Sequence, residues 1–343
     1  MLDDQHYIKQ HDVQDALGVV AGQAKQLEHD FAISLSTSTR IDSIVVAGMG
    51  GSALAASLIP VWPGLSKPFE VVRGYSLPAY VGAHTLVIVS SYSGNTEETV
   101  SALADAATRG AEIIVIAAGG KLASAAEAQS YPLFRLPDGL QPRMAVLYNL
   151  AALVQLLEQL GLVSKGSVDE LRTTSAWLQS HSASWLAHVA TADNRAKQIA
   201  QELMGKSVVI YGGPKLWPAA YKWKININEN AKQIAWCNQL PEFNHNEFSG
   251  WTEQPEHKPY AIIDLRSNLE NERVQKRFVV TERLLSGKRP KPIVVEAEGE
   301  TILKQLLWTI ALGDFVSVYL ALCSGINPTP VDLIEKFKKA MEE

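Results

Sequence analysis

Two segments rich in glycine and hydroxyl side chains are the parts of this sequence best suited to bind an anion. They are Gly48-Met49-Gly50-Gly51-Ser52 and Ser90-Ser91-Tyr92-Ser93-Gly94-Asn95-Thr96. Each follows an apolar run typical of a buried strand and precedes a helical pattern. Glycine lets the backbone approach an anion closely, and the N–H groups of a helix start point towards it. We therefore expect a phosphate monoester to be bound by six residues: Gly50, Gly51, Ser52, Ser91, Ser93 and Thr96.

Neutral donors suit this phosphate site because neither segment contains an acidic side chain, so we expect no metal ion there. The first segment does not fit a dinucleotide-binding Gly-x-Gly-x-x-Gly, because Ala53 stands where the last glycine would fall, and no Gly-Lys-Ser/Thr of a P-loop follows it. For the second segment, a structural alternative is a helix N-cap at Thr96. An N-cap accounts for only one or two of its hydroxyls.

An acid and an imidazole in the second half of the chain could transfer protons. Glu229 lies between Asn228 and Asn230, and helix interiors disfavour asparagine, so the three indicate a helix end or a polar site. His245 lies in a polar loop, and imidazole titrates near neutral pH. The alternative for Glu229 is a solvated carboxylate. The remaining histidines have polar surroundings and form no metal-ligand pattern.

Two positively charged side chains, Arg143 and Lys338, complete the set of candidate site residues. Arg143 follows Pro142 and precedes an apolar helical pattern, where a cation opposes the helix dipole unless an anion binds nearby. Its alternative is a solvated helix start. Lys338 shares a helical face with Val331, Ile334 and Met341, and we expect this face to turn inward.

The two glycine- and hydroxyl-rich segments resemble the phosphate-binding loops of the sugar isomerase (SIS) domain. Further motifs narrow the resemblance to the bifunctional phosphoglucose/phosphomannose isomerases. These motifs are Pro142-Arg143, Asn228-Glu229-Asn230-Ala231-Lys232, the run Pro241-Glu242-Phe243-Asn244-His245-Asn246-Glu247 with Gly250-Trp251, and Asn327-Pro328-Thr329-Pro330-Val331. Phe337 replaces a usual leucine and Asn327 a usual aspartate. The resemblance spans residues 40 to 340.

The resemblance implies an aldose–ketose isomerase that interconverts glucose 6-phosphate and mannose 6-phosphate with fructose 6-phosphate through a cis-enediol. It implies Glu229 as the base, Arg143 beside the enediolate, and His245 with Lys338 at the sugar ring. It also implies a homodimer with His245 contributed across the interface, and no cofactor. Two alternatives stay open: an isomerase of another phosphosugar, and a non-catalytic SIS protein that senses one.

The elements that must position these residues alternate between strand and helix. Apolar runs at residues 43–47, 69–73, 85–90 and 112–117 predict strands, as do 207–211, 260–264 and 292–297. Helical patterns cover 13–31, 144–160, 218–232, 302–323 and 331–341. This alternation predicts an α/β protein with two doubly wound domains, mainly parallel sheets and helices on both faces. We expect an N-terminal domain over 1–150 and a C-terminal domain over 151–343.

Composition restricts the class of partner. The 343 residues carry a net charge of −5, which gives no reason to expect binding to nucleic acid or to a membrane surface. The start of the chain is polar, unlike a signal peptide, and the two cysteines, Cys237 and Cys323, form no metal or disulfide pattern. The apolar run 306–322 carries Gly313 and Asp314 at its centre, so we expect a buried core helix. A cytoplasmic enzyme follows from these features.

Overall fold

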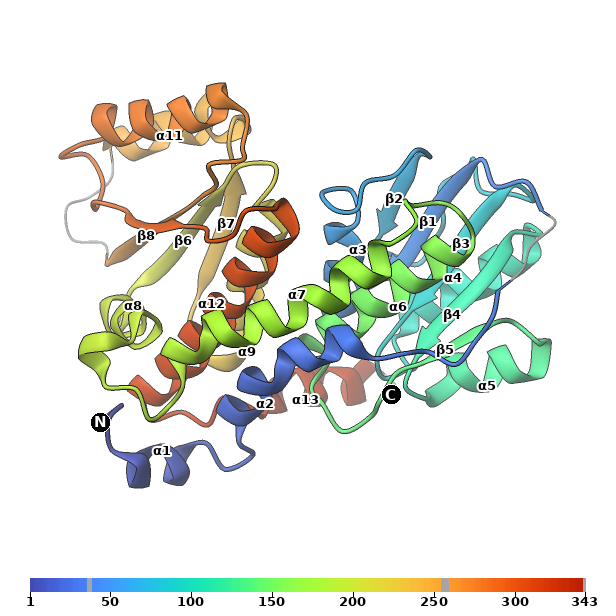
Figure 1. Ribbon diagram of the computed structural model, residues 1–343, viewed down its shortest axis with the longest axis horizontal. Coiled ribbons are helices and arrows are strands. Elements are labelled where there is room, and N and C mark those ends of the chain that lie inside the picture. Colours follow the sequence, from blue (N-terminus) through green and yellow to red (C-terminus); the bar gives the residue numbers. More distant parts are fainter. Residues whose placement is uncertain (36–38, 254–258, 342–343) are drawn as a thin grey trace. The chain divides into compact units, whose positions relative to one another are not determined.

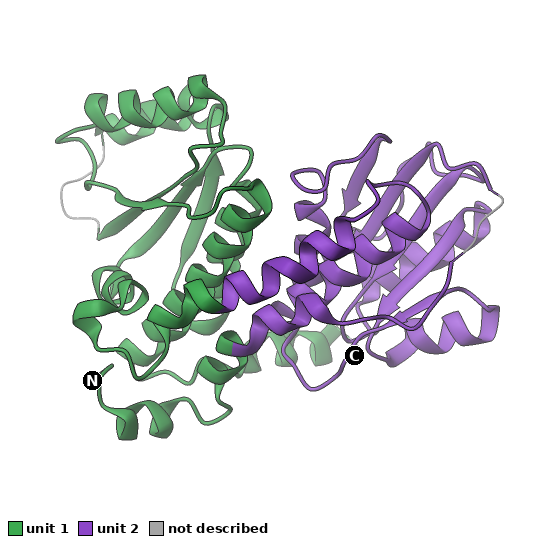
Figure 2. Cartoon of the chain, in the orientation of Figure 1, with its two compact units in different colours: residues 1–21, 180–343 green, residues 22–179 purple. Residues whose placement is uncertain are grey.

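The computed structural model describes residues 1–35, 39–253 and 259–341. The chain forms two compact units, coloured separately in Figure 2. One unit comprises residues 22–179, and the other comprises 1–21 together with 180–343. We call them the first-sheet unit and the second-sheet unit, because each contains one β-sheet. The division of the sequence into domains at residue 150 stays a prediction.

The first-sheet unit is built on five parallel strands in the order β2-β1-β3-β4-β5 (Figure 1). Its central strands are almost wholly buried apolar runs, as expected for a sheet covered on both faces. The strands are β1 (Ser43–Gly48), β2 (Phe69–Val72), β3 (Thr85–Ser90), β4 (Glu112–Ala117) and β5 (Leu133–Arg135).

Helices cover both faces of this sheet. Helix α3 (Gly50–Leu58) packs against α6 (Val146–Gln159) on one face. Helices α4 (Glu97–Thr108) and α5 (Gly120–Gln129) share a core cluster with the other face. The chain leaves β1 towards one side of the sheet and reaches β3 on the other side, so β1 and β3 flank the topological switch point.

The second-sheet unit repeats this topology with four parallel strands in the order β7-β6-β8-β9. They are β6 (Ser207–Gly212), β7 (Ala235–Gln239), β8 (Tyr260–Arg266) and β9 (Ile293–Glu296). The position of β6 in this order corresponds to that of β1, and the position of β8 to that of β3. The expected fold of two doubly wound halves is therefore confirmed.

One face of the second sheet carries α9 (Trp217–Asn230) and α12 (Ile302–Cys323), and α8 (Arg195–Leu203) packs on α12. The opposite face carries α11 (Glu272–Leu284), as Figure 1 shows. Helix α12 is long and apolar enough to cross a membrane, but its most apolar window is buried within the protein. The expectation of a core helix is confirmed.

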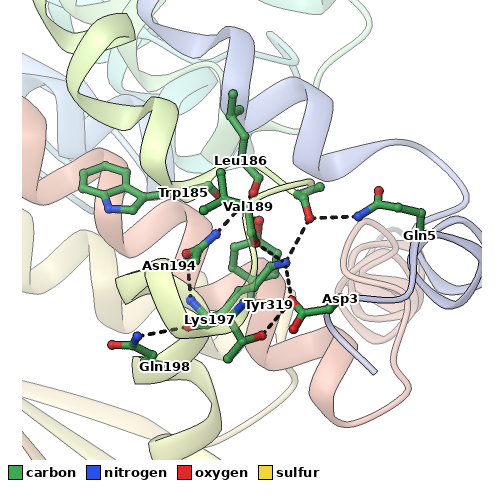
Figure 3. A network of polar contacts seen from close by, with 11 residues as sticks. Asp3, Gln5, Trp185, Leu186, Val189, Asn194, Lys197, Gln198 and Tyr319 are labelled. Carbon is green, nitrogen blue, oxygen red and sulfur yellow. Dashed lines mark hydrogen bonds and ion pairs between the residues drawn. The ribbon is translucent and has the colours of Figure 1, made fainter.

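A buried lysine ties the start of the chain into the second-sheet unit (Figure 3). The side chain of Lys197 on α8 is 0% exposed, and its ammonium donates to Asp3 Oδ1 at 3.0 Å. It also donates to the carbonyls of Ala187 at 2.9 Å and Val189 at 2.8 Å. A buried ammonium must have partners, because water no longer solvates it. This network explains why residues 1–21 belong to a unit otherwise built from residues after 179.

The remaining elements are short or lie at the edges of the two units. The α-helices are α1 (Gln5–His11), α2 (Ala16–Gly22), α7 (Ser167–Ser182), α10 (Glu247–Gly250) and α13 (Asp332–Met341). The 3-10 turns are η1 (Gln23–Glu28), η2 (Pro142–Met144), η3 (Ala183–Trp185), η4 (Thr191–Asp193), η5 (Glu242–His245) and η6 (Trp251–Glu253).

Two expectations about elements need correction. The pattern at 13–31 is not one helix: Asp12 accepts from the N–H groups of Ala16 and Leu17, so α2 begins there, and the chain changes to a 3-10 turn after Gly22. The edge strands β5 and β7 carry no strand signal in the sequence. In β7, the exposed Trp236 and the polar Asn238 and Gln239 leave no continuous apolar run.

Candidate active site

The two anion-binding segments follow neighbouring strands. Gly48, the last residue of β1, pairs in register with Ser90, the last residue of β3. Both loops therefore leave the sheet at the same carboxyl edge, beside the switch point where ligands of doubly wound folds bind. A Cβ on Gly48 would lie 2.9 Å from the carbonyl oxygen of Ser90, so the strands approach too closely for a side chain there.

The first loop turns directly into α3. Met49 is the N-cap residue, and Gly50 has a φ of +47°, which favours glycine. Gly51 and Ser52 are buried in the first turn, where backbone N–H groups lack intrahelical partners. A Cβ on Gly51 would lie 2.5 Å from the carbonyl oxygen of Pro142, so the Pro142-Arg143 motif packs on the start of α3.

Arg143 is only 2% exposed, although it belongs to a short 3-10 turn. Its Nη1 lies 3.5 Å from Oε1 of Gln141, a long hydrogen bond. A solvated helix start, the structural alternative for this residue, is therefore wrong. The close packing of Gly51 on Pro142 brings the backbone of the buried Arg143 next to the helix start that is expected to bind the phosphate.

The second loop is held together by its own hydroxyls. Ser91 Oγ and Thr96 Oγ1 lie 2.8 Å apart, and Ser91 Oγ also accepts from the N–H of Gly94 at 3.2 Å. Thr96 is the N-cap residue of α4, but its hydroxyl bonds to Ser91. Ser93 is exposed and accepts from the N–H of Asn95 at 3.3 Å. A pair of hydroxyls uses one proton for its mutual bond, so the second proton remains for an anion.

Glu229 lies in the last turn of α9, and both flanking asparagines anchor that turn. Asn228 Oδ1 accepts from the N–H of Ala235 at the start of β7, at 2.9 Å. Asn230 Nδ2 donates to Ser317 Oγ of α12 at 2.8 Å. The indication of a helix end is confirmed. Glu229 itself is half-buried on this firmly held turn.

Lys232 links this helix end to the closing motif of the chain. Its Nζ donates to the carbonyls of Glu229 at 2.8 Å, Asn327 at 3.3 Å and Pro328 at 3.2 Å. The motif leads into α13, whose side chains are all exposed in the single chain. The expectation that Lys338 faces inward is therefore wrong for one chain: it is 58% exposed and pairs with Glu335 at 2.7 Å.

His245 lies at the end of η5, in a segment fixed to the opposite face of the second sheet. Phe243 is buried and packs on the ring of Tyr211, with centroids 4.6 Å apart. The carboxylate of Glu247 accepts from the hydroxyl of Tyr211 and, at 2.7 Å, from Nδ2 of Asn238. Burial, together with the charge of Glu247, raises the pKa of Tyr211, so this phenol stays a donor.

Tyr211 and Asn238 therefore hold the segment that carries His245, and the sequence analysis did not single out either residue. The sequence offered one indication, for Tyr211: it is a polar aromatic residue near the end of a buried strand, directly before two glycines. Glu247 uses both carboxylate oxygens in this clamp, while the imidazole of His245 is exposed.

Glu229 and His245 lie far apart within one chain. Glu229 is on α9, level with the start of β7, whereas the His245 segment lies on the α11 face, level with Asn238. The three steps from Ala235 to Asn238 separate these levels by about 10 Å at the usual rise of a strand. The thickness of the sheet adds to this distance, so the two residues of one chain are well separated.

Comparisons with known proteins agree with the two repeated halves. The family model "SIS domain" matches residues 39–132, and "Bacterial phospho-glucose isomerase C-terminal SIS domain" matches residues 192–341. In the solved C-terminal domain of glucosamine-fructose-6-phosphate aminotransferase from Francisella tularensis, 98% of that chain superposes on 95% of this one. The TM-score is 0.69 and the identity is 14%, so this likeness shows the fold alone.

Three curated relatives match most of the chain. The bifunctional phosphoglucose/phosphomannose isomerase of Caldicellulosiruptor bescii is 38% identical over 88% of this chain and 90% of its own. That of Aquifex aeolicus is 33% identical over 96% of this chain and 99% of its own. A D-glucosamine-6-phosphate 4-epimerase of Sulfolobus acidocaldarius is 30% identical, over 87% and 89%.

Proposed function

Since the chain belongs to the family of bifunctional phosphoglucose/phosphomannose isomerases, we propose that it interconverts glucose 6-phosphate and mannose 6-phosphate with fructose 6-phosphate. One structural observation carries this proposal. The glycine and hydroxyl loops after β1 and β3 leave the same edge at the switch point of the first sheet, and the backbone of the buried Arg143 lies next to Gly51.

The phosphate is bound by the N–H groups of Gly50 and Gly51 and by the hydroxyls of Ser52, Ser91, Ser93 and Thr96. Backbone N–H groups at a helix start and hydroxyl donors together satisfy a dianion without an opposing carboxylate. Binding the phosphate, which does not react, supplies free energy that holds C1 and C2 in place for proton transfer.

Glu229 removes the proton from C2 of the open-chain aldose and returns it to C1, through a cis-enediol. Its position on an anchored helix turn suits a base that must reach two adjacent carbon atoms precisely in each cycle. Arg143 stabilises the negative charge that develops on the enediolate oxygen. Before this step, His245 protonates the ring oxygen and Lys338 assists at the ring hydroxyls, which opens the cyclic sugar.

The protein works as a homodimer in which His245 acts in the site of the partner subunit. The separation of Glu229 and His245 on opposite faces of one sheet supports this assignment, because a partner chain can supply the histidine that does not lie beside Glu229. The exposure of α13 supports it too, since Lys338 needs a covering surface to meet a substrate. We place the enzyme in the cytoplasm, where sugar phosphates are converted.

The test is an assay of the purified protein on fructose 6-phosphate, with excess chelator present and with both aldose products quantified. We expect glucose 6-phosphate and mannose 6-phosphate to form, and solvent deuterium to enter at C2. Failure to form either aldose would overturn the proposal.

The epimerase among the relatives gives a second candidate function, inversion at C4 of glucosamine 6-phosphate. Incubation with glucosamine 6-phosphate distinguishes the two. Formation of the C4 epimer, without aldose products from fructose 6-phosphate, would favour the epimerase.

A further inference from the structure

Two residues occupy equivalent positions in the two sheets, one in the loop after β3 and the other in the loop after β8. Gly48 pairs in register with Ser90 in the first sheet, and Gly212 pairs with Leu265 in the second. Six residues after Ser90 comes Thr96, the N-cap of α4, and six residues after Leu265 comes Asn271, the N-cap of α11. The residues just before these caps, Asn95 and Glu270, therefore correspond.

Asn95 turns away from the phosphate loop that follows β1. Its Oδ1 accepts from the N–H of Lys121 at 3.0 Å, at the start of α5 in the neighbouring loop after β4. The space between the loops after β1 and β3 is thereby left to the hydroxyls of Ser91 and Thr96.

Glu270 turns the opposite way, towards the loop that follows β6. Its Oε2 accepts from the N–H of Lys215 at 2.9 Å, and its Oε1 accepts from the N–H of Asn271 at 3.0 Å. A Cβ on Gly213 would lie 2.5 Å from Oε2, so the carboxylate rests directly on the glycine backbone. Glu270 is only 8% exposed.

The carboxylate of Glu270 therefore bonds to the backbone of the two loops as a bound anion would. A glycine that permits close approach, backbone N–H groups beside it and donors from a second loop are the features proposed for phosphate binding in the first half. In the second half, a carboxylate of the chain itself already meets them. The cluster lies at the carboxyl edge of the sheet, one full length of α9 away from Glu229.

We propose that the loops after β6 and β8 form a second anion-binding cradle, and that the carboxylate of Glu270 occupies it. Of these two corresponding loop pairs in the described residues, the one in the first half is then the one left open for a phosphate group. The cradle would accept inorganic phosphate, or another small oxyanion, once the carboxylate is removed. The open position in the first half rests on the proposed function, whereas the occupied cradle does not.

The experiment is a calorimetric titration of inorganic phosphate into three proteins: the wild type, Glu270→Ala and the matched control Glu272→Ala, whose side chain lies outside the cradle on α11. We expect Glu270→Ala to bind one more phosphate per chain than the wild type, and the control to bind the same number. A crystal of Glu270→Ala soaked in phosphate should show the added ion on the N–H groups of Lys215 and Asn271.

The titration is repeated with Thr96→Val added, so that loss of the first-half site and gain of the second are measured separately. If Glu270→Ala is unstable, phosphate should raise its melting temperature more than it raises that of the wild type, whereas chloride at equal ionic strength should not. A folded Glu270→Ala that binds no additional phosphate would overturn the proposal. A variant that phosphate does not rescue, or a wild type that already binds phosphate at the second sheet, would overturn it too.

Discussion

Glu229 and His245 stand on opposite faces of the same four-stranded sheet, Glu229 on the last turn of α9 and His245 in the segment that packs with α11. Glu229 lies level with Ala235 at the start of β7, and the His245 segment lies level with Asn238, which is about 10 Å further along this strand. If both residues serve one reaction, this separation favours a pair drawn from different copies of the chain.

Mixing two inactive variants tests this arrangement. A dimer of Glu229→Gln with His245→Ala contains one intact pair and one doubly defective pair. Random exchange of subunits should therefore restore about a quarter of the wild-type sites. Activity is measured after the variants are exchanged under conditions that dissociate the dimer.

The matched control mixes Glu229→Gln with a chain carrying both substitutions, which leaves no intact pair in any dimer. Restored activity in this control would mean contamination. No restoration in a dimer proven to be mixed would contradict the shared site.

The role of His245 in ring opening predicts a dependence on the form of the substrate. His245→Ala should slow turnover of the cyclic hexose phosphates by about 10²–10⁴, the usual contribution of a general acid or base. A shorter sugar phosphate that cannot close a ring should be affected much less. Equal losses on both substrates would exclude a role confined to ring opening.

Glu229→Gln should abolish turnover and leave phosphosugar affinity nearly unchanged, because an amide keeps the shape of the side chain but cannot take a proton. We expect a loss in kcat of about 10²–10⁴ with little change in KM or in substrate binding measured by calorimetry. Glu202→Gln on the exposed surface of α8 is the control.

Glu247, the next acid in the motif, is the alternative candidate for the catalytic base. Both of its oxygens are used by Tyr211 and Asn238, so Tyr211→Phe should loosen the His245 segment and mimic His245→Ala weakly. Retention of most activity in Glu229→Gln, with complete loss in Glu247→Gln, would reassign the base.

Removing a hydroxyl from the second phosphate loop should weaken substrate binding. Thr96→Val keeps the shape of the side chain, and a lost hydrogen bond to a charged group costs about 1.5–3 kcal/mol, which raises KM about 10- to 100-fold. Thr108→Val at the other end of α4 should leave KM unchanged, because its hydroxyl bonds only within the helix, to the carbonyl of Ala104. An unchanged KM in Thr96→Val would remove this residue from the phosphate site.

The ion pair of Asp3 with Lys197 predicts how stability depends on pH. The hydrogen bond from Lys197 lowers the pKa of Asp3 below its usual 3.8, so the pair stabilises the fold fully above that pH. The contribution is lost as the pH falls from 3.8 through the lower pKa of the folded state. Asp3→Asn should therefore melt below the wild type at neutral pH, and the two melting temperatures should converge in acid. A difference that is independent of pH would contradict this assignment.

The local sequence was sufficient to predict those strands and helices whose residues are nearly all buried. Strands 43–47, 85–90 and 112–117 are apolar between their polar end residues because helices cover both faces of the sheet, and helix 302–323 is mostly apolar because it is buried on nearly all sides. The two glycine- and hydroxyl-rich loops between strand and helix could be located too, and their binding of phosphate stays a prediction.

Only the tertiary structure decided which residues meet across long stretches of chain. The edge strands β5 and β7 owe their existence to a neighbouring strand, which no local pattern encodes. Arg143 is buried because Pro142 packs on a glycine that lies 91 positions earlier, and Lys338 is exposed although its helical face is apolar. Asn95 and Glu270 occupy equivalent positions yet turn towards different loops, because each side chain bonds to whichever backbone N–H groups the sheet brings within reach. The residue types determined which chemical groups the chain has, and long-range packing determined where each group lies.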